Sequence, residues 1–95
     1  MITYSENMLQ KLKTLLNEGG YAVKSGKGNF NTGHCLLSSK RVVVINKFHS
    51  TEASVTALIE LIEHLTFSET NLSDASRQVL LDVKNHLVKN KTRLF

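Results

Sequence analysis

A chain of 95 residues, 41% of them hydrophobic and 21% charged, is long enough for one modest core, and we expect residues 1–95 to form a single domain. No apolar run approaches the roughly 18 residues of a membrane span, the one cysteine has no partner for an internal disulfide, and the first residues lack the pattern of a secretory signal. We therefore expect a cytoplasmic protein.

The formal net charge of +4 is distributed unevenly along the chain. Residues 19–49 hold five basic residues and no acid, residues 50–83 hold six acids and one arginine, and residues 84–95 hold four basic residues. A basic segment beside an acidic one favours contacts within one molecule or between two copies, and it also offers a face to an anion. The same distribution is typical of an ordinary solvated surface, so charge alone does not decide between these interpretations.

The first predicted element is a helix that begins after Ser5 and ends at Gly19–Gly20. The Ser5 hydroxyl can cap the helix, and glycine adopts the left-handed backbone that ends a helix without a Cβ clash. Between these signals, apolar residues recur with a period of 3.6 residues, which predicts one buried stripe. The stripe consists of Met8, Leu9, Leu12, Leu15 and Leu16.

Three strands are predicted next, and the connections between them favour an antiparallel sheet. Gly26–Gly33 contains three glycines and two asparagines and is typical of a wide hairpin loop, while Ser38–Lys40 fits a tight turn. Val42–Ile45 is apolar on both faces, which places this strand at the centre of the sheet or in its best-covered position. The predicted strands cover residues 21–25, 34–38 and 41–47.

A second helix is predicted from near Glu52 to Phe67, capped by Ser50 or Thr51. Its apolar face is too wide for one neighbour, so the helix lies between the sheet and another helix, or part of it meets a second molecule. The apolar residues are Val55, Ala57, Leu58, Ile59, Leu61, Ile62 and Leu65.

A third helix is predicted to begin at Ser73–Asp74. Leu81 and Val88 lie off its main apolar stripe, seven residues apart, and form an accessory apolar surface. The element order is α-β-β-β-α-α, which predicts an α+β fold with a three-stranded antiparallel sheet packed against helices.

The basic, glycine-rich segment is the first candidate site. Lysine side chains and glycine amides can bind phosphate, and a phenylalanine can stack on a base. The segment is not a Walker loop, since the G-K-[ST] end and the following helix are missing, and lysines also occur on many exposed hairpins. The candidate anion- or nucleic-acid-binding residues are Lys24, Lys27, Gly28, Phe30, Lys40 and Arg41.

The second candidate is a polar cluster formed by Glu60, Glu63 and His64. It is similar to the H-x-x-E-H zinc motif with the first histidine replaced by glutamate, and its spacing places all three residues on one side of a helix. The same spacing is typical of an ordinary polar helix face. Because the chain has no C-x-x-C or H-x-x-x-H pair and no intact catalytic motif, we predict no metal, no cofactor and no catalytic residue.

The central third of the chain resembles a family of small uncharacterised bacterial proteins of similar length. The shared pattern is G-Y-x-V-x-x-x-K-G-x-F-x-x-G-x-C, then a polar turn, then V-V-V-I-N-K. The matching positions are Gly20, Tyr21, Val23, Lys27, Gly28, Phe30, Gly33, Cys35 and residues 42–47. The resemblance implies a bacterial protein but no activity.

A fainter resemblance is to the ImmA/IrrE-type metallopeptidases, in which a strand similar to VVVIN leads into a helix bearing H-E-x-x-H. The corresponding window here is Ile59–Glu63, in which Glu60 matches the general base of the family. The two histidine positions are Ile59 and Glu63, so the resemblance implies a shared strand–helix scaffold without zinc chemistry.

We therefore expect a small protein-interaction domain, not an enzyme, that forms a homodimer. One alternative is nucleic-acid or anion binding by the basic segment, for which affinity would fall steeply with salt. The other alternative is a degenerate or unrecognised hydrolase centred on Glu60, Glu63 and His64.

Overall fold

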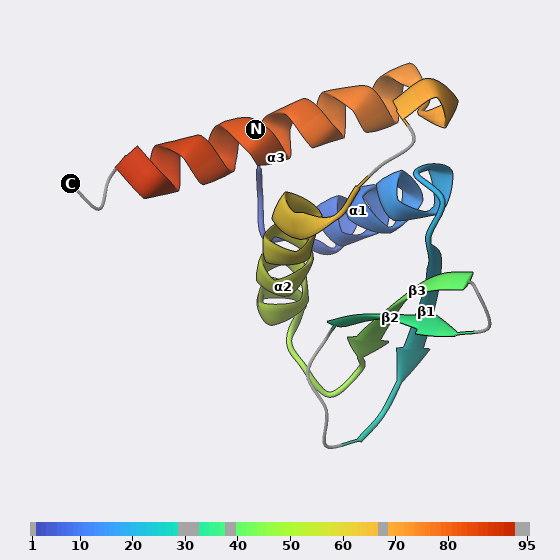
Figure 1. Cartoon of the computed structure of the whole chain (residues 1–95). Coiled ribbons are helices and arrows are strands. Elements are labelled where there is room, and N and C mark those ends of the chain that lie inside the picture. The colour runs from blue at the N-terminus through green and yellow to red at the C-terminus, as the bar shows by residue number, and fades with distance from the viewer. Residues whose placement is uncertain (1, 29–32, 38–39, 67–68, 93–95) are drawn as a thin grey trace.

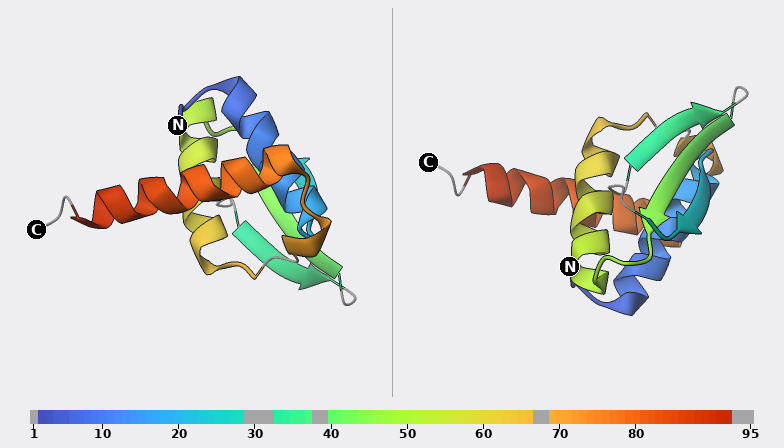
Figure 2. Two further views of the ribbon diagram at one scale, coloured as in Figure 1. Left: turned by 90° about the horizontal axis from the view of Figure 1, so that it is seen from above. Right: turned by 90° about the horizontal axis from the view of Figure 1, so that it is seen from below.

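The computed structural model describes residues 2–28, 33–37, 40–66 and 69–92, and these form three layers (Figure 1). A three-stranded sheet forms the first layer, α1 (Glu6–Glu18) and α2 (Thr51–His64) the second, and α3 (Asp74–Thr92) the third. A short 3₁₀ turn, η1 (Glu69–Asn71), precedes α3. Figure 2 shows from above and below that these helices lie on one face of the sheet.

The first helix has the caps and the buried stripe that its sequence predicts. The Ser5 hydroxyl accepts a hydrogen bond from the Met8 amide at 3.2 Å. Gly20 has a φ of 101°, and the Tyr21 amide donates to the Leu16 carbonyl at 2.9 Å, as in a Schellman motif. The five predicted stripe residues are all buried, and Leu12, Leu15 and Leu16 are completely inaccessible.

The sheet is mixed, so the prediction of a three-stranded antiparallel sheet is wrong. Its strands are β1 (Ala22–Gly26), β2 (Gly33–Leu37) and β3 (Lys40–Asn46), in the order β1-β3-β2. β3 runs antiparallel to β2 but parallel to β1. The α+β class remains compatible with this architecture.

The physical reason for the parallel pair is the position of β3. Val42, Val43 and Ile45 are 0–4% exposed, so β3 is most stable between two other strands. A hairpin between β1 and β2 would have made them neighbours and left β3 at an edge. The 13 residues between Gly26 and Lys40 instead contain β2, which lies on the far side of β3 and runs antiparallel to it, so that β3 runs parallel to β1.

Asn46, at the end of β3, holds the residues after β1 and the turn after β3 together. Its side chain is 2% exposed, its Nδ2 donates to the Gly28 carbonyl at 2.9 Å, and its Oδ1 accepts from the Phe48 amide at 3.0 Å. The Lys47 amide also donates to the Gly26 carbonyl at 2.8 Å. The end of β1 and the turn before α2 are therefore held together by satisfied, buried polar groups.

The wide apolar face of α2 is covered within the molecule. Because α2 lies in the layer between the sheet and α3, both of its apolar flanks meet neighbours (Figure 1). The helix is capped by Ser50 and ends at His64, three residues before its predicted end at Phe67, which lies outside the described residues. The apolar residues that pack in the core are Val55, Leu58, Ile59, Ile62, Leu61 and Leu65, whereas Ala57, which the sequence also placed on this face, lines a hollow on the outer side of α2.

The start of α3 is tied to the end of α1. The Ser73 hydroxyl accepts from the Ser76 amide at 3.2 Å, and the Glu18 carboxylate accepts from the Ser73 amide at 2.8 Å. The hydrogen bond from the Ser73 amide, followed by those from the Ser76 and Ser73 hydroxyls, lowers the pKa of Glu18. A carboxylate at this position also interacts favourably with the positive end of the α3 dipole.

Candidate functional site

The basic residues predicted as an anion site are divided between the two faces and the two ends of the sheet. Lys24 is exposed and pairs with Val44 in the β1–β3 register, whereas Arg41 lies over the ring of Tyr21, 5.7 Å from its centroid. Because side chains alternate along a strand, Arg41 and Lys24 lie on opposite faces. Arg41 also lies about three residues, or roughly 10 Å, along the sheet from the level of Lys24, which pairs with Val44.

The remaining members of this group are only partly described. Lys27 is exposed and Gly28 is half-buried after the end of β1, where the Gly28 carbonyl is bound by Asn46. Phe30 and the side chain of Lys40 lie outside the described residues. The structure therefore brings Lys24, Lys27 and Gly28 to one end of the sheet, but it places Arg41 elsewhere.

Glu60, Glu63 and His64 all lie on α2; Glu60 and His64 are exposed, whereas the side chain of Glu63 is 25% exposed. Glu63 Oε2 and His64 Nε2 are 3.8 Å apart. Within the described residues, no group of three or more His, Cys, Asp or Glu side chains is arranged to hold a metal ion. Ile59, which takes the first histidine position of the resembling peptidase motif, is 3% exposed and packs in the core.

Glu60 belongs to a shallow hollow on the side of α2 that faces away from the core. The hollow has a volume of about 680 Å³ and begins at the turn before the helix. Small side chains and two carboxylates line it. We call this surface the α2 outer face; it is lined by His49, Ser50, Glu52, Ala53, Thr56, Ala57 and Glu60.

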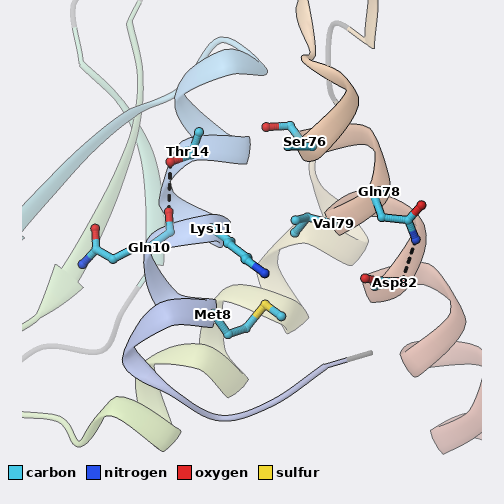
Figure 3. Close-up of a pocket in the computed structure, with 9 residues that line it drawn as sticks. Met8, Gln10, Lys11, Thr14, Ser76, Gln78, Val79 and Asp82 are labelled. Carbon is cyan, nitrogen blue, oxygen red and sulfur yellow. Dashed lines mark hydrogen bonds between the residues drawn. The ribbon is translucent and has the colours of Figure 1, made fainter.

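A second concavity lies between α1 and α3 and has a volume of about 480 Å³. Met8 and Val79 point toward each other across it, and Lys11 extends from α1 toward α3 (Figure 3). Asp82 lies on the opposite wall, and partial burial by itself raises its pKa. Hydrogen bonds and nearby positive charges, including the hydrogen bond from Gln78 and the charge of Lys11, lower it more, so the pKa of Asp82 lies below its ordinary value. The groove thus combines an apolar floor with one charge on each wall.

The second half of α3 extends beyond the rest of the molecule (Figures 1 and 2). On the helix side that faces away from the core, Leu81 is 51% exposed and Val88 is 62% exposed. Arg77 and Lys84 are also exposed and follow the same 4-3-4 spacing. We call these four residues the α3 outer face; it carries two large apolar side chains on one side of the helix, two turns apart.

The sequence revealed some of these surfaces and missed others. The seven-residue spacing of Leu81 and Val88 is visible in the sequence, and so is the polar side of α2 that contains Glu60. The groove between α1 and α3 was missed, since no local pattern says which helices pack side by side. The hollow on α2 was also missed, although Ala53 and Ala57, one turn apart on the acidic side of the helix, are a readable signal for it.

Comparison with protein-family models, with curated proteins and with solved structures gives no match for this chain. The function is therefore argued from the geometry of these surfaces. Among the residues that the structure describes, no helix is both long and apolar enough to cross a membrane.

Proposed function

We propose that this chain is a protein-interaction domain that associates with a second copy of itself. The observation that carries the proposal is the exposure of Leu81 and Val88 on the outer side of α3, the helix whose second half extends past the body of the molecule. A helix that serves only the fold normally buries its apolar residues against a neighbour. Here the core-facing side of α3 is already occupied, and these two residues point elsewhere.

The basis of this proposal differs from that expected from the sequence. The wide apolar face of α2 was the main reason to expect a dimer, but that face packs against the sheet, α1 and α3. The accessory surface of α3 therefore becomes the principal interaction surface. Its two apolar side chains supply about 1.5–3 kcal/mol each at full burial, so a stable dimer needs additional contacts around them.

Analytical ultracentrifugation over a wide concentration range tests the proposal. We expect the wild-type chain to approach twice its monomer mass of 10.6 kDa, and the Leu81→Gln/Val88→Gln variant to remain monomeric. Glutamine retains helix propensity, so the change removes apolar surface without weakening the helix itself.

Phe48→Gln is the matched control, because Phe48 is 67% exposed on the turn between β3 and α2 and its loss leaves α3 intact. We expect this variant to associate like the wild type. A wild-type chain that stays monomeric up to about 1 mM, which corresponds to roughly −4 kcal/mol of association free energy, would contradict self-association.

Self-association accounts for the geometry better than nucleic-acid binding does. A phosphate-binding surface needs its cationic groups to converge on one backbone. Lys24 and Arg41 lie on opposite faces of the sheet instead. The exposed apolar residues of α3 also have no role in an anion site.

A further inference from the structure

The groove between α1 and α3 has the size and the position of a small-molecule site. Its volume of about 480 Å³ falls within the range of roughly 300–1,000 Å³ that is usual for such sites, and many of them lie between packed helices. Small side chains keep the groove open: Thr14 on α1, and Ala75 and Ser76 on α3. A molecule of modest size can therefore enter it from the solvent.

The floor of the groove is apolar and belongs to the core. Met8 is 4% exposed and Val79 is 7% exposed, and both are members of the hydrophobic core cluster. Because packing already orders these two side chains, an apolar group placed between them gains contacts without the cost of fixing its site. The floor therefore favours a ligand with an apolar body.

Most polar side chains that line the groove already have partners on their own helix. Thr14 Oγ1 donates to the Gln10 carbonyl at 3.0 Å on α1. On α3, Gln78 Nε2 donates to Asp82 Oδ1 at 3.0 Å. These hydrogen bonds hold the two walls in place and do not call for a ligand.

Lys11 differs from these side chains. It is exposed, and it extends from α1 toward α3 across the apolar floor (Figure 3). It acts on Asp82 through its charge, and no hydrogen bond or ion pair joins Lys11 to any described residue. An ammonium group that has no bound counter-charge therefore lies at the edge of an apolar surface.

We propose that this groove binds a small amphipathic monoanion, with its apolar body on Met8 and Val79 and its anionic head group on Lys11. Medium-chain carboxylates and alkyl sulfates share this chemistry. The Asp82 carboxylate repels the head group, so the bound charge stays on the α1 side of the groove. The site is independent of the proposed self-association, because the groove and the α3 outer face lie on opposite sides of α3.

Octanoate, octanol and octylammonium test the proposal, because they share one apolar tail and differ in charge. Titration of ¹⁵N-labelled protein, followed through amide chemical shifts, locates each complex and gives its Kd. We expect saturable shifts with octanoate at residues 8–14 and 75–82, which line the groove. Octanol should bind about 3- to 5-fold more weakly than octanoate, as expected for the loss of one exposed charge interaction, and octylammonium should bind most weakly.

Charge variants assign the head group to its partner. Lys11→Gln should weaken octanoate binding by the same factor and leave octanol binding unchanged. Asp82→Asn should strengthen octanoate binding, because it removes the like charge from the opposite wall. Lys13→Gln is the matched control for Lys11→Gln, since Lys13 also lies on α1 but does not line the groove.

A variant that fills the groove tests the site of the tail. Ala75→Leu keeps good helix propensity and places a large side chain in the groove, so it should abolish binding of both octanoate and octanol. Ala53→Leu makes the same change in the hollow on α2 and should leave both affinities unchanged.

Two results would overturn the proposal. One is the absence of saturable octanoate shifts at the groove. The other is equal binding of octanoate and octanol together with an Lys11→Gln variant that alters neither. Self-association, which ultracentrifugation measures, stands or falls separately from both.

Discussion

The two halves of α3 belong to one helix but have different surroundings. In the first half, residues 74–83, Leu80 is 5% exposed and Val83 is completely buried. In the second half, residues 84–92, Leu87 is partly buried against the core, but Val88 is 62% exposed. The comparison indicates that burial ties the first half closely to the core, while the second half contributes less to it.

The largest expected difference is between the stability losses caused by alanine at two adjacent leucines of the first half, Leu80 and Leu81. Leu80→Ala should lower the free energy of unfolding by about 2–5 kcal/mol, since it leaves a cavity in the core. Leu81→Ala makes the same chemical change on the outer face and should alter it by at most about 0.5 kcal/mol in dilute, monomeric protein. Urea denaturation measures both, and equal losses would contradict the assignment of these faces.

The next effect concerns the carboxylate that anchors the start of α3. Glu18 has a pKa below its ordinary value of 4.5, so its contribution to stability is present above pH 4.5 and is lost as the pH falls through the folded-state pKa. Glu18→Gln should therefore be less stable than the wild type at pH 7, and the two stabilities should converge in acid.

Thermal unfolding of Glu18→Gln between pH 2 and pH 7 measures this convergence. The matched control is Glu60→Gln, which removes a carboxylate from the exposed side of α2 instead of from a helix cap. A difference between wild type and Glu18→Gln that stays constant across the pH range would rule out the charged cap as its source.

The smallest expected effect concerns the side chains that meet the second half of α3. Tyr4 Oη lies 3.1 Å from His86 Nε2, and the two rings meet edge to face. Because this hydrogen bond is exposed, Tyr4→Phe should reduce stability by at most about 0.5 kcal/mol.

Tyr21→Phe is the informative counterpart to Tyr4→Phe. It removes a hydroxyl that donates to the Thr66 carbonyl at 3.1 Å from a tyrosine that is 6% exposed, and it should reduce stability by about 1 kcal/mol. Urea denaturation of both variants tests the order of the two effects, and a larger loss for Tyr4→Phe would mean that the second half of α3 is bound more firmly than its exposure implies.

The helix signals were predictable because they are local. Ser5, Ser50 and Ser73 each cap the helix that follows, and the apolar stripe of α1 is buried as its period indicates. The second helix ends earlier than predicted, since Leu65 adopts an extended backbone but still packs against the core. A continuing apolar pattern thus does not require a continuing helix.

The strand pairing was not predictable from connection length and glycine content. Two expectations from the sequence conflicted: a chain of hairpins would leave β3 at the edge, whereas Val42–Ile45 is apolar on both faces and favours the centre. The central position is the one observed. Burial on both faces of a strand therefore outweighed the hairpin character of the loop before it.

The candidate surfaces were also predictable only where they depend on the spacing along a single helix. Glu60 and the Leu81/Val88 pair follow from residue spacing along one helix, whereas the hollow beside Glu60 and the groove beside Lys11 depend on how helices pack in three dimensions. The basic residues looked like one site because they are close in sequence. The strand pairing separates Arg41 from Lys24 by placing them on opposite faces.

Amide hydrogen exchange of α3 at increasing protein concentration tests the central claim most directly. We expect the first half to be strongly protected at every concentration, and the second half to gain protection as copies associate through Leu81 and Val88. Protection of residues 84–92 that does not change with concentration would contradict an interaction surface on this half of the helix.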